Sequence, residues 1–173
     1  TYSSRMSLAY NNTKYFQTGE STDPEKSFVR ALAIAAEQKS DFVALIGDIF
    51  SFPSEAAVDW ATAQLAAAGL PFYYTAGNHD WHYEGMEGSL ADLRKTWIEK
   101  RLKRMYNSAD PMMQSFEVND ISFIILDNSN YEILPAQLDF FRDRINNGKP
   151  TILMLHIPLF APGRSVGFGC GNP

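Results

Sequence analysis

The sequence predicts an α/β fold in which helices layer a mixed β-sheet. Two strand–loop–helix units follow one another, beginning at Phe42 and at Phe72. Because crossovers between parallel strands are right-handed, successive units of this kind place their strands in parallel. A two-residue connection, Asn119-Asp120, then joins two apolar runs, which is typical of an antiparallel hairpin. Parallel and antiparallel pairs in one chain indicate a mixed sheet.

The first predicted element is a helix that ends at about Gln38. Residues 22–25 form a capping-box pattern with a proline in the first turn. Apolar residues then recur at the spacing of one helical face. Residues 1–20 show no clear period and are predicted to be loop or extended surface.

The two strand–helix units have clear boundaries. The first strand is Phe42–Ile46, closed by Gly47-Asp48. An alanine-rich helix then opens at Ser54 and ends near Gly69. The second unit has a strand, a longer loop and a helix, predicted at Phe72–Thr75, 76–88 and Ser89 to about Lys103.

The rest of the chain supplies a hairpin, a helix and a last strand. The hairpin strands are Met113–Val118 and Ile121–Asp127, and the last strand, Thr151–Leu155, ends at His156. Between them a helix is expected from Leu134-Pro135 to about Asn146, with three apolar side chains facing inward: Leu138, Phe141 and Ile145. The segment 157–173, rich in proline and glycine, is predicted to be an active-site loop.

Composition limits the possible functions. A chain of 173 residues that is 45% hydrophobic can form one domain with its own core. The net charge of −5 argues against a general nucleic-acid surface, because phosphate binding needs clustered Lys and Arg. The single cysteine, Cys170, cannot form an internal disulfide. No apolar run approaches the roughly 18 residues of a membrane span.

Polar side chains gather where the predicted strands end. Asp48 follows the first strand, Asn78 and His79 follow the second, and His156 follows the last. In α/β sheets, ligands bind at the carboxyl ends of parallel strands. Oxygen and imidazole ligands suit a divalent metal such as Zn²⁺, Mn²⁺ or Fe. Each residue alone is commoner as a turn former or a buried polar group, so the prediction of a metal site depends on the set.

Three motifs in order resemble those of the calcineurin-like metallophosphoesterase superfamily, which includes the purple acid phosphatases. They are Gly47-Asp48, Gly77-Asn78-His79-Asp80 and Leu155-His156-Ile157-Pro158. The resemblance implies a two-sheet, layered sandwich flanked by helices. A plain doubly wound sheet is the alternative fold, and it would place the same loops on one edge.

The resemblance also implies a role for each residue. Asp48 would bridge two metals, Mn, Fe or Zn, while Asn78 and His156 would bind the second metal. His79 would face the leaving group, with Asp80 tuning its orientation and charge. The metals, roughly 3.5–4 Å apart, would activate a hydroxide for in-line attack on a small phosphate monoester or diester. Nucleotides and phosphoproteins stay open as substrates.

Two motifs of the superfamily are missing from the chain. There is no Asp-x-His on a first strand and no Gly-His-x-His after His156. Asp80-Trp81-His82 has the first spacing but lies in the wrong loop. We therefore expect a fragment that lacks its first strand and its C-terminal histidine loop and holds metal poorly by itself. The alternative is a diverged, inactive binding module with the same fold.

Aromatic residues crowd the two predicted site loops. Phe50, Phe52, Trp81 and Tyr83 are candidates for stacking on a nucleobase or aryl group, or else for plain packing. His82 is a candidate substrate contact or a surface residue. Asp127 and Asn128, at the end of the hairpin, are candidates for supporting the site edge or for a plain turn.

Overall fold

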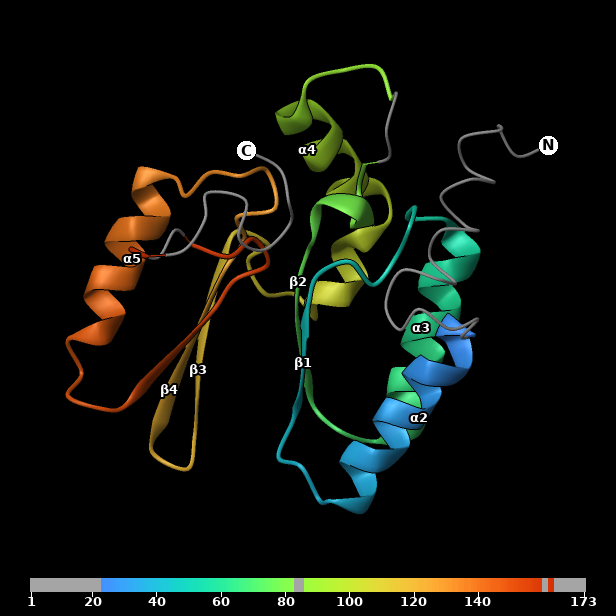
Figure 1. The fold of residues 1–173 in the computed structure, drawn as a ribbon, viewed down its shortest axis with the longest axis horizontal. Helices are drawn as coiled ribbons and strands as arrows, with labels where there is room; N and C mark the ends of the chain where they lie inside the picture. Colours follow the sequence, from blue (N-terminus) through green and yellow to red (C-terminus); the bar gives the residue numbers. More distant parts are fainter. Residues whose placement is uncertain (1–22, 83–85, 160–161, 164–173) are drawn as a thin grey trace.

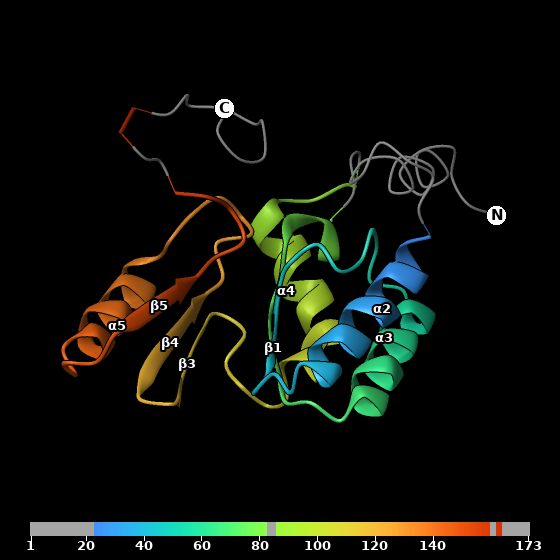
Figure 2. The ribbon, with the colours of Figure 1, turned by 60° about the horizontal axis from the view of Figure 1, so that its bottom comes forward.

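The computed structural model describes residues 23–82, 86–159 and 162–163. These residues form four layers. In Figures 1 and 2, helices α2, α3 and α4 lie on one side of a pair of sheets, and helix α5 lies on the other. The described strands form a two-stranded sheet, β1-β2, and a three-stranded sheet, β3-β4-β5. The predicted α/β sandwich of mixed sheets flanked by helices is therefore confirmed.

The β1-β2 sheet pairs the strands of the two predicted strand–helix units. Strands β1 (Val43–Ile46) and β2 (Phe72–Thr75) pair in parallel, as predicted. Helix α2 is Pro24–Glu37, and helix α3, Glu55–Ala68, connects the two strands. The side chain of Ser54 caps the start of α3, and Gly69 ends it with a left-handed φ of 69°.

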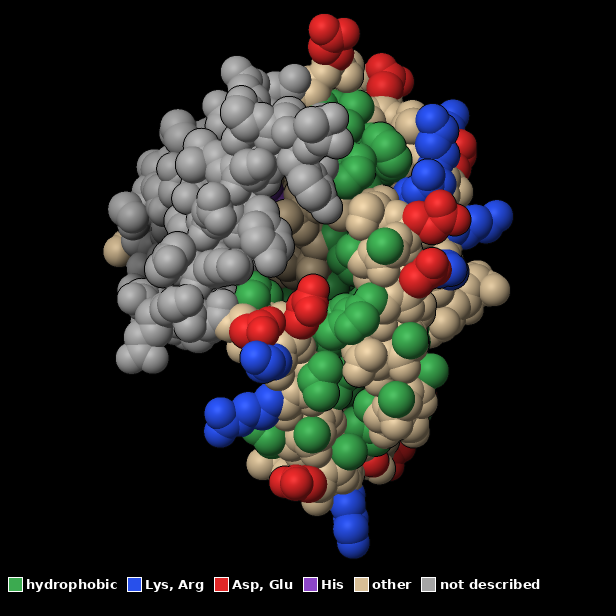
Figure 3. All heavy atoms as spheres, turned by 90° about the vertical axis from the view of Figure 1, so that its right-hand side faces the viewer, with side chains coloured by type: hydrophobic (Ala, Val, Ile, Leu, Met, Phe, Trp, Pro, Cys, Tyr) green, Lys and Arg blue, Asp and Glu red, His purple; other side chains and the backbone are tan. Residues whose placement is uncertain are grey.

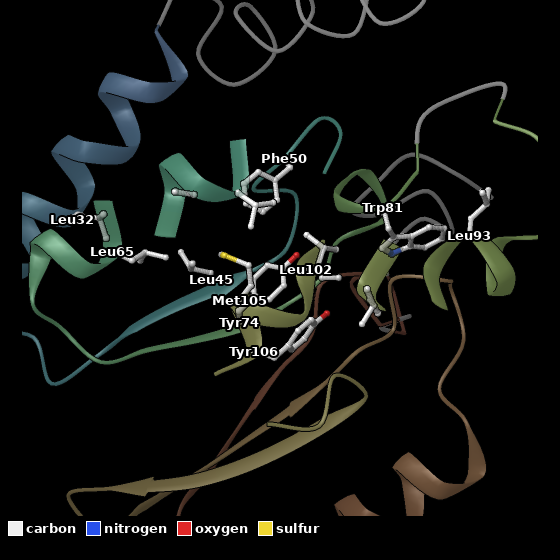
Figure 4. Close-up of a cluster of buried hydrophobic side chains, with 14 residues drawn as sticks. Leu32, Leu45, Phe50, Leu65, Tyr74, Trp81, Leu93, Leu102, Met105 and Tyr106 are labelled. Carbon is white, nitrogen blue, oxygen red and sulfur yellow. The ribbon is translucent and has the colours of Figure 1, made fainter. Parts of the chain in front are cut away.

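The helix predicted from Ser89 to Lys103 is shorter than expected. Helix α4 is Leu90–Lys100, and a 3-10 segment, η2, continues over Leu102–Tyr106. The buried side chains of η2 join Tyr74 and Leu45 in the core that lies between β2 and the helices (Figure 4). We attribute the break at Arg101 to this packing, because the tighter turn brings the apolar side chains of η2 to the core.

The second sheet contains the predicted hairpin. Strands β3 (Met113–Val118) and β4 (Ile121–Leu126) are antiparallel, and β5 (Thr151–Met154) pairs with β4 in parallel. Both turn residues, Asn119 and Asp120, have positive φ angles, 50° and 62°. Positive φ at both positions defines the turn type that two-residue hairpins favour.

The predicted inward face of α5 (Pro135–Ile145) is wrong in two positions. Leu138 and Ile145 are 41% and 39% exposed, whereas Gln137 is 1% exposed. The buried amide of Gln137 accepts a hydrogen bond from the backbone of Leu134 and donates to the carbonyls of Met112 and Asp127. The need to satisfy these backbone groups, rather than apolar spacing, sets the rotation of the helix.

Aromatic rings hold the two sheets together. Phe42 lies edge-on to Tyr73, Phe116 and Phe123, with ring centroids 5.0–5.5 Å apart. Tyr73 of β2 also stacks on Phe116 of β3. Such contacts contribute roughly 0.5–1.5 kcal/mol each beyond the burial of area. They bring β1 and β2 against the second sheet, so that loops from both sheets meet.

The outer surface of α2 and α3 carries mixed charges. Acidic and basic side chains are interspersed on the face that Figure 3 shows. Within the described residues, no helix has the length and apolar composition that crossing a membrane requires.

Candidate metal centre

Three strand ends from the two sheets meet at one place. Asp48 follows β1, Asn78 follows β2, and His156 follows β5 of the second sheet. The Nε2 atom of His156 lies 3.3 Å from Oδ1 of Asp48 and 3.2 Å from Oδ1 of Asn78. Thus the structure brings together the three residues that the sequence analysis predicted as metal ligands.

A hydrogen bond of Nδ1 leaves Nε2 as the atom of His156 that can bind a metal. Nδ1 of His156 lies 2.9 Å from the carbonyl oxygen of Ile46. A carbonyl only accepts hydrogen bonds, so Nδ1 is the donor and carries a proton. In a neutral imidazole the lone pair is then on Nε2, which faces Asp48 and Asn78. Histidine ligands of metals commonly show this arrangement.

The donor atoms fit a metal ion. Two ligands at right angles, each about 2.1 Å from one ion, are about 3.0 Å apart. The distances of 3.2 and 3.3 Å from Nε2 to the two oxygens are close to this value. Among the described residues, no group of three or more His, Cys, Asp or Glu side chains could hold a metal. The third donor of this site is an amide oxygen, that of Asn78.

The charges of Asp48 and His156 stabilise each other. Burial raises the pKa of Asp48, but the hydrogen bond and the charge of His156 outweigh it and leave this pKa below 3.8. Burial lowers the pKa of His156, but the hydrogen bond and the charge of Asp48 outweigh it and leave that pKa above 6.5. The site therefore favours a cation between these groups, which is a proton or a metal ion.

Two glycines allow the site loops to touch. A Cβ atom on Gly47 would lie 2.6 Å from the backbone nitrogen of Gly77 and would also collide with the ring of His156. A Cβ on Gly77 would collide with the carboxylate and the backbone of Asp48. Gly47 and Asp48 have positive φ angles, 94° and 56°. A non-glycine residue with positive φ is uncommon and clusters at functional sites.

His79 lies at the rim of the site. Its backbone N–H donates a hydrogen bond to Oδ1 of Asp48, with 3.0 Å between the atoms. Its side chain is exposed. Burial, and then the charge of His79, lower the pKa of His82.

Asp80 acts on the site through the backbone. Its side chain is fully buried and accepts hydrogen bonds from the N–H groups of Phe50 and Gly77 and from the hydroxyl of Tyr74. Burial raises the pKa of Asp80 to about 7, although these three hydrogen bonds act in the opposite direction. The carboxyl group joins the Asp48 loop to the Gly77 turn. That Asp80 tunes the orientation and charge of His79 stays a prediction.

The aromatic residues near the site divide into two groups. Phe50 and Trp81 are buried in the core, so the alternative of packing, rather than stacking on a substrate, holds for both. Phe52 packs edge-on against Trp97, with ring centroids 5.1 Å apart. Tyr83 lies outside the described residues.

One buried ion pair near the site was missed by the sequence analysis. Arg94 of α4 donates from Nε to Oδ2 of Asp127, 33 residues later, at 3.1 Å. The other oxygen of Asp127 accepts from the backbone and the hydroxyl of Ser129. The hydroxyl of Ser129 in turn accepts from the indole of Trp81. No local pattern links residues so far apart, and only the position of Asp127 at a strand end pointed to this region.

A comparison with protein-family models identifies the family of the chain. The model of the calcineurin-like phosphoesterases matches residues 22–172. The chain therefore belongs to the calcineurin-like phosphoesterase family.

Two known proteins show similarity over most of the chain. A probable cyclic nucleotide phosphodiesterase of Psychrobacter arcticus is 28% identical over an alignment of 133 residues, and the match covers 72% of this chain and 45% of that protein. The crystal structure of a dimetal phosphatase from Danio rerio is 16% identical with a TM-score of 0.45, over 71% of this chain and 42% of that one. The chain thus spans less than half the length of either relative.

Proposed function

We propose that the chain forms part of a metal-dependent phosphoesterase that hydrolyses a phosphate ester. The proposal depends on one observation: side-chain oxygens of Asp48 and Asn78 both lie within 3.3 Å of Nε2 of His156. Membership of the calcineurin-like phosphoesterase family supports it.

The three residues would hold a divalent ion through two oxygens and one nitrogen. Donors of this kind suit Mn²⁺, Fe or Zn²⁺. The side chain of Asp48 is 38% exposed, which leaves it room to bridge to a second ion. When bound, the metals supply Lewis acidity that polarises the phosphate.

The residues of the Gly77 turn would act on the departing alcohol. His79 is exposed, and its backbone N–H donates to the carboxylate of Asp48, which supports a place for its imidazole beside the proposed metal site. There it would donate a proton to the leaving oxygen or stabilise its charge. Asp80 would serve this step indirectly, by fixing the turn that carries His79.

A titration with metal tests the proposal. The full-length protein that carries this chain is stripped of metal and titrated with Mn²⁺ in a calorimeter. Hydrolysis is then measured with p-nitrophenyl phosphate, with its bis ester and with a cyclic nucleotide. The cyclic nucleotide is included because the chain is similar to a probable cyclic nucleotide phosphodiesterase. We expect binding of Mn²⁺ and metal-dependent release of product from at least one ester.

Matched variants connect the result to the site. Asp48→Asn should strongly lower both binding of Mn²⁺ and hydrolysis, because it removes the charge of a ligand. Asp139→Asn is the control, since this exposed aspartate pairs with Arg142 on α5. Metal binding without hydrolysis of any ester would favour the inactive binding module, and equal activity of Asp48→Asn and the unmutated protein would contradict the proposal.

A further inference from the structure

Three consecutive polar residues are buried beside the proposed metal centre. Asp127, Asn128 and Ser129 follow β4, and their exposed fractions are 1%, 3% and 0%. Polar groups at this depth need hydrogen bonds, because an unpaired one loses its interaction with water without compensation. The partners of these side chains therefore show what the segment does.

Asn128 binds the backbone of the loop that carries His156. Its Oδ1 atom accepts from the N–H groups of His156 and Ile157, at 3.2 and 2.9 Å. Its Nδ2 atom donates to the carbonyl oxygen of Ile157, at 2.7 Å. One side chain thus binds the N–H and the carbonyl group of Ile157 and the N–H of His156, two to three residues after the end of β5.

The hydrogen bonds of Asn128 lie just beyond the end of the pairing between β4 and β5. The parallel ladder between β4 and β5 stops at the pair Ile125 and Met154. His156 lies two residues beyond this pair, where the ladder no longer fixes its backbone. There the amide of Asn128 holds the backbone of His156 and Ile157, and the position of the His156 imidazole depends on this backbone.

The neighbours of Asn128 connect it to the other half of the centre. Asp127 accepts two hydrogen bonds from Ser129, and the hydroxyl of Ser129 accepts from the indole of Trp81, at 2.9 Å. Trp81 directly follows the turn that carries Asn78 and His79. The segment 127–129 therefore touches two of the three loops that supply ligands, those of His156 and Asn78, and Arg94 anchors it through Asp127.

The geometry points to Asn128 as a positioning residue of the proposed metal centre, which holds His156 in register with Asp48 and Asn78. The inference depends on the proposed function, because the register matters only if these residues share an ion. Asn128 itself need not touch the metal or the substrate. Residues that orient metal ligands in this way typically change metal affinity or activity 10–100-fold when they are replaced.

The test compares two buried amides in the full-length protein. Asn128→Ala removes the three bonds to the His156 loop. Gln114→Ala is the control, because Gln114 is also buried and donates to a backbone carbonyl, that of Tyr74 in β2. Mn²⁺ affinity is measured by calorimetry and stability by urea unfolding in EDTA. We expect both variants to lose stability and only Asn128→Ala to lose Mn²⁺ affinity, about 10–100-fold.

Excess metal distinguishes positioning from a general structural defect. If Asn128 positions a ligand, raising Mn²⁺ should restore much of the hydrolysis in Asn128→Ala, because bound metal holds His156 in place. If Asn128→Ala does not fold, Asn128→Asp replaces it. It keeps the shape and the acceptor for the two N–H groups, but it replaces the donor to Ile157 by an oxygen that repels the Ile157 carbonyl. The charge of the new carboxylate would attract the ion, so weaker binding in that variant is a stringent confirmation.

The possible outcomes separate the two proposals. If the unmutated protein binds no Mn²⁺, the proposed function fails and this inference fails with it. If the unmutated protein binds Mn²⁺ and the folded Asn128 variant binds it as tightly, only the inference is overturned. Equal losses of affinity in Asn128→Ala and Gln114→Ala would also overturn it.

Discussion

The Nδ1 atom of His156 lies 2.9 Å from the carbonyl oxygen of Ile46, which is 110 residues earlier in the chain. This contact joins the end of β5 to the end of β1 and selects the tautomer in which Nε2 can bind a metal. The stability and the metal affinity of the protein should both depend on it.

Metal affinity should fall as the pH falls. His156 has to be unprotonated at Nε2 to act as a ligand, and its pKa is above 6.5 because of Asp48. Below this pKa, protons compete with the ion, and the apparent affinity should drop up to about tenfold per pH unit. Calorimetric titration with Mn²⁺ between pH 8 and pH 5.5 measures the effect. His82→Asn should keep the same slope, and a flat profile would exclude His156 as a ligand.

Asp80 should make the metal-free protein less stable as the pH rises. Its folded-state pKa is about 7, whereas the unfolded value is near 3.8. Between these values the native state binds more protons than the unfolded state, so the free energy of unfolding falls with rising pH. The contribution approaches about 4 kcal/mol across this window. Urea unfolding at pH 5 and pH 7.5 measures the part of this contribution that falls between these pH values, about 2–3 kcal/mol.

Asp80→Asn supplies the control for that effect. The variant loses an acceptor and should be less stable at every pH, but it has no group that titrates at this position. From pH 5 to pH 7.5 the free energy of unfolding should therefore fall by about 2–3 kcal/mol more in the unmutated protein than in the variant. Parallel curves for the two proteins would show that Asp80 is ionised throughout.

Gly47→Ala should be more destabilising than Gly69→Ala. Both glycines have positive φ, so each substitution costs about 1–2 kcal/mol of backbone strain. Only at Gly47 does the new Cβ also collide with Gly77 and His156, and overpacking typically adds about 1–3 kcal/mol. Thermal or urea unfolding measures both. Equal losses would mean that the two loops move apart easily.

The buried Arg94 pair should matter more than an exposed one. The side chains of Arg94 and Asp127 are 11% and 0% exposed, so Arg94→Met leaves a buried carboxylate without its partner. We expect a loss of about 3–5 kcal/mol. Arg104→Met is the matched control, because Arg104 and Asp59 are 49% and 56% exposed and such pairs contribute about 0–1 kcal/mol. Similar losses in urea unfolding would contradict the assignment.

Local chemistry in the sequence determined most of the secondary structure. The cap at Ser54, the left-handed Gly69 and the turn Asn119-Asp120 each act within a few residues. The parallel pairing of β1 and β2 also followed, because short crossovers allow few topologies. The order of the motifs was enough to predict the family, which the comparison confirmed.

The tertiary structure decided how side chains from distant segments share their hydrogen bonds. The burial of Gln137, the contacts of Asp80 and the pair of Arg94 with Asp127 all depend on backbone groups or charges that lie far away in sequence. The sequence placed Asp48, Asn78 and His156 at strand ends, but only the packing of one sheet on the other set the distances between them. Hydrogen bonds and charges act through space, so their partners are defined only after the chain has folded.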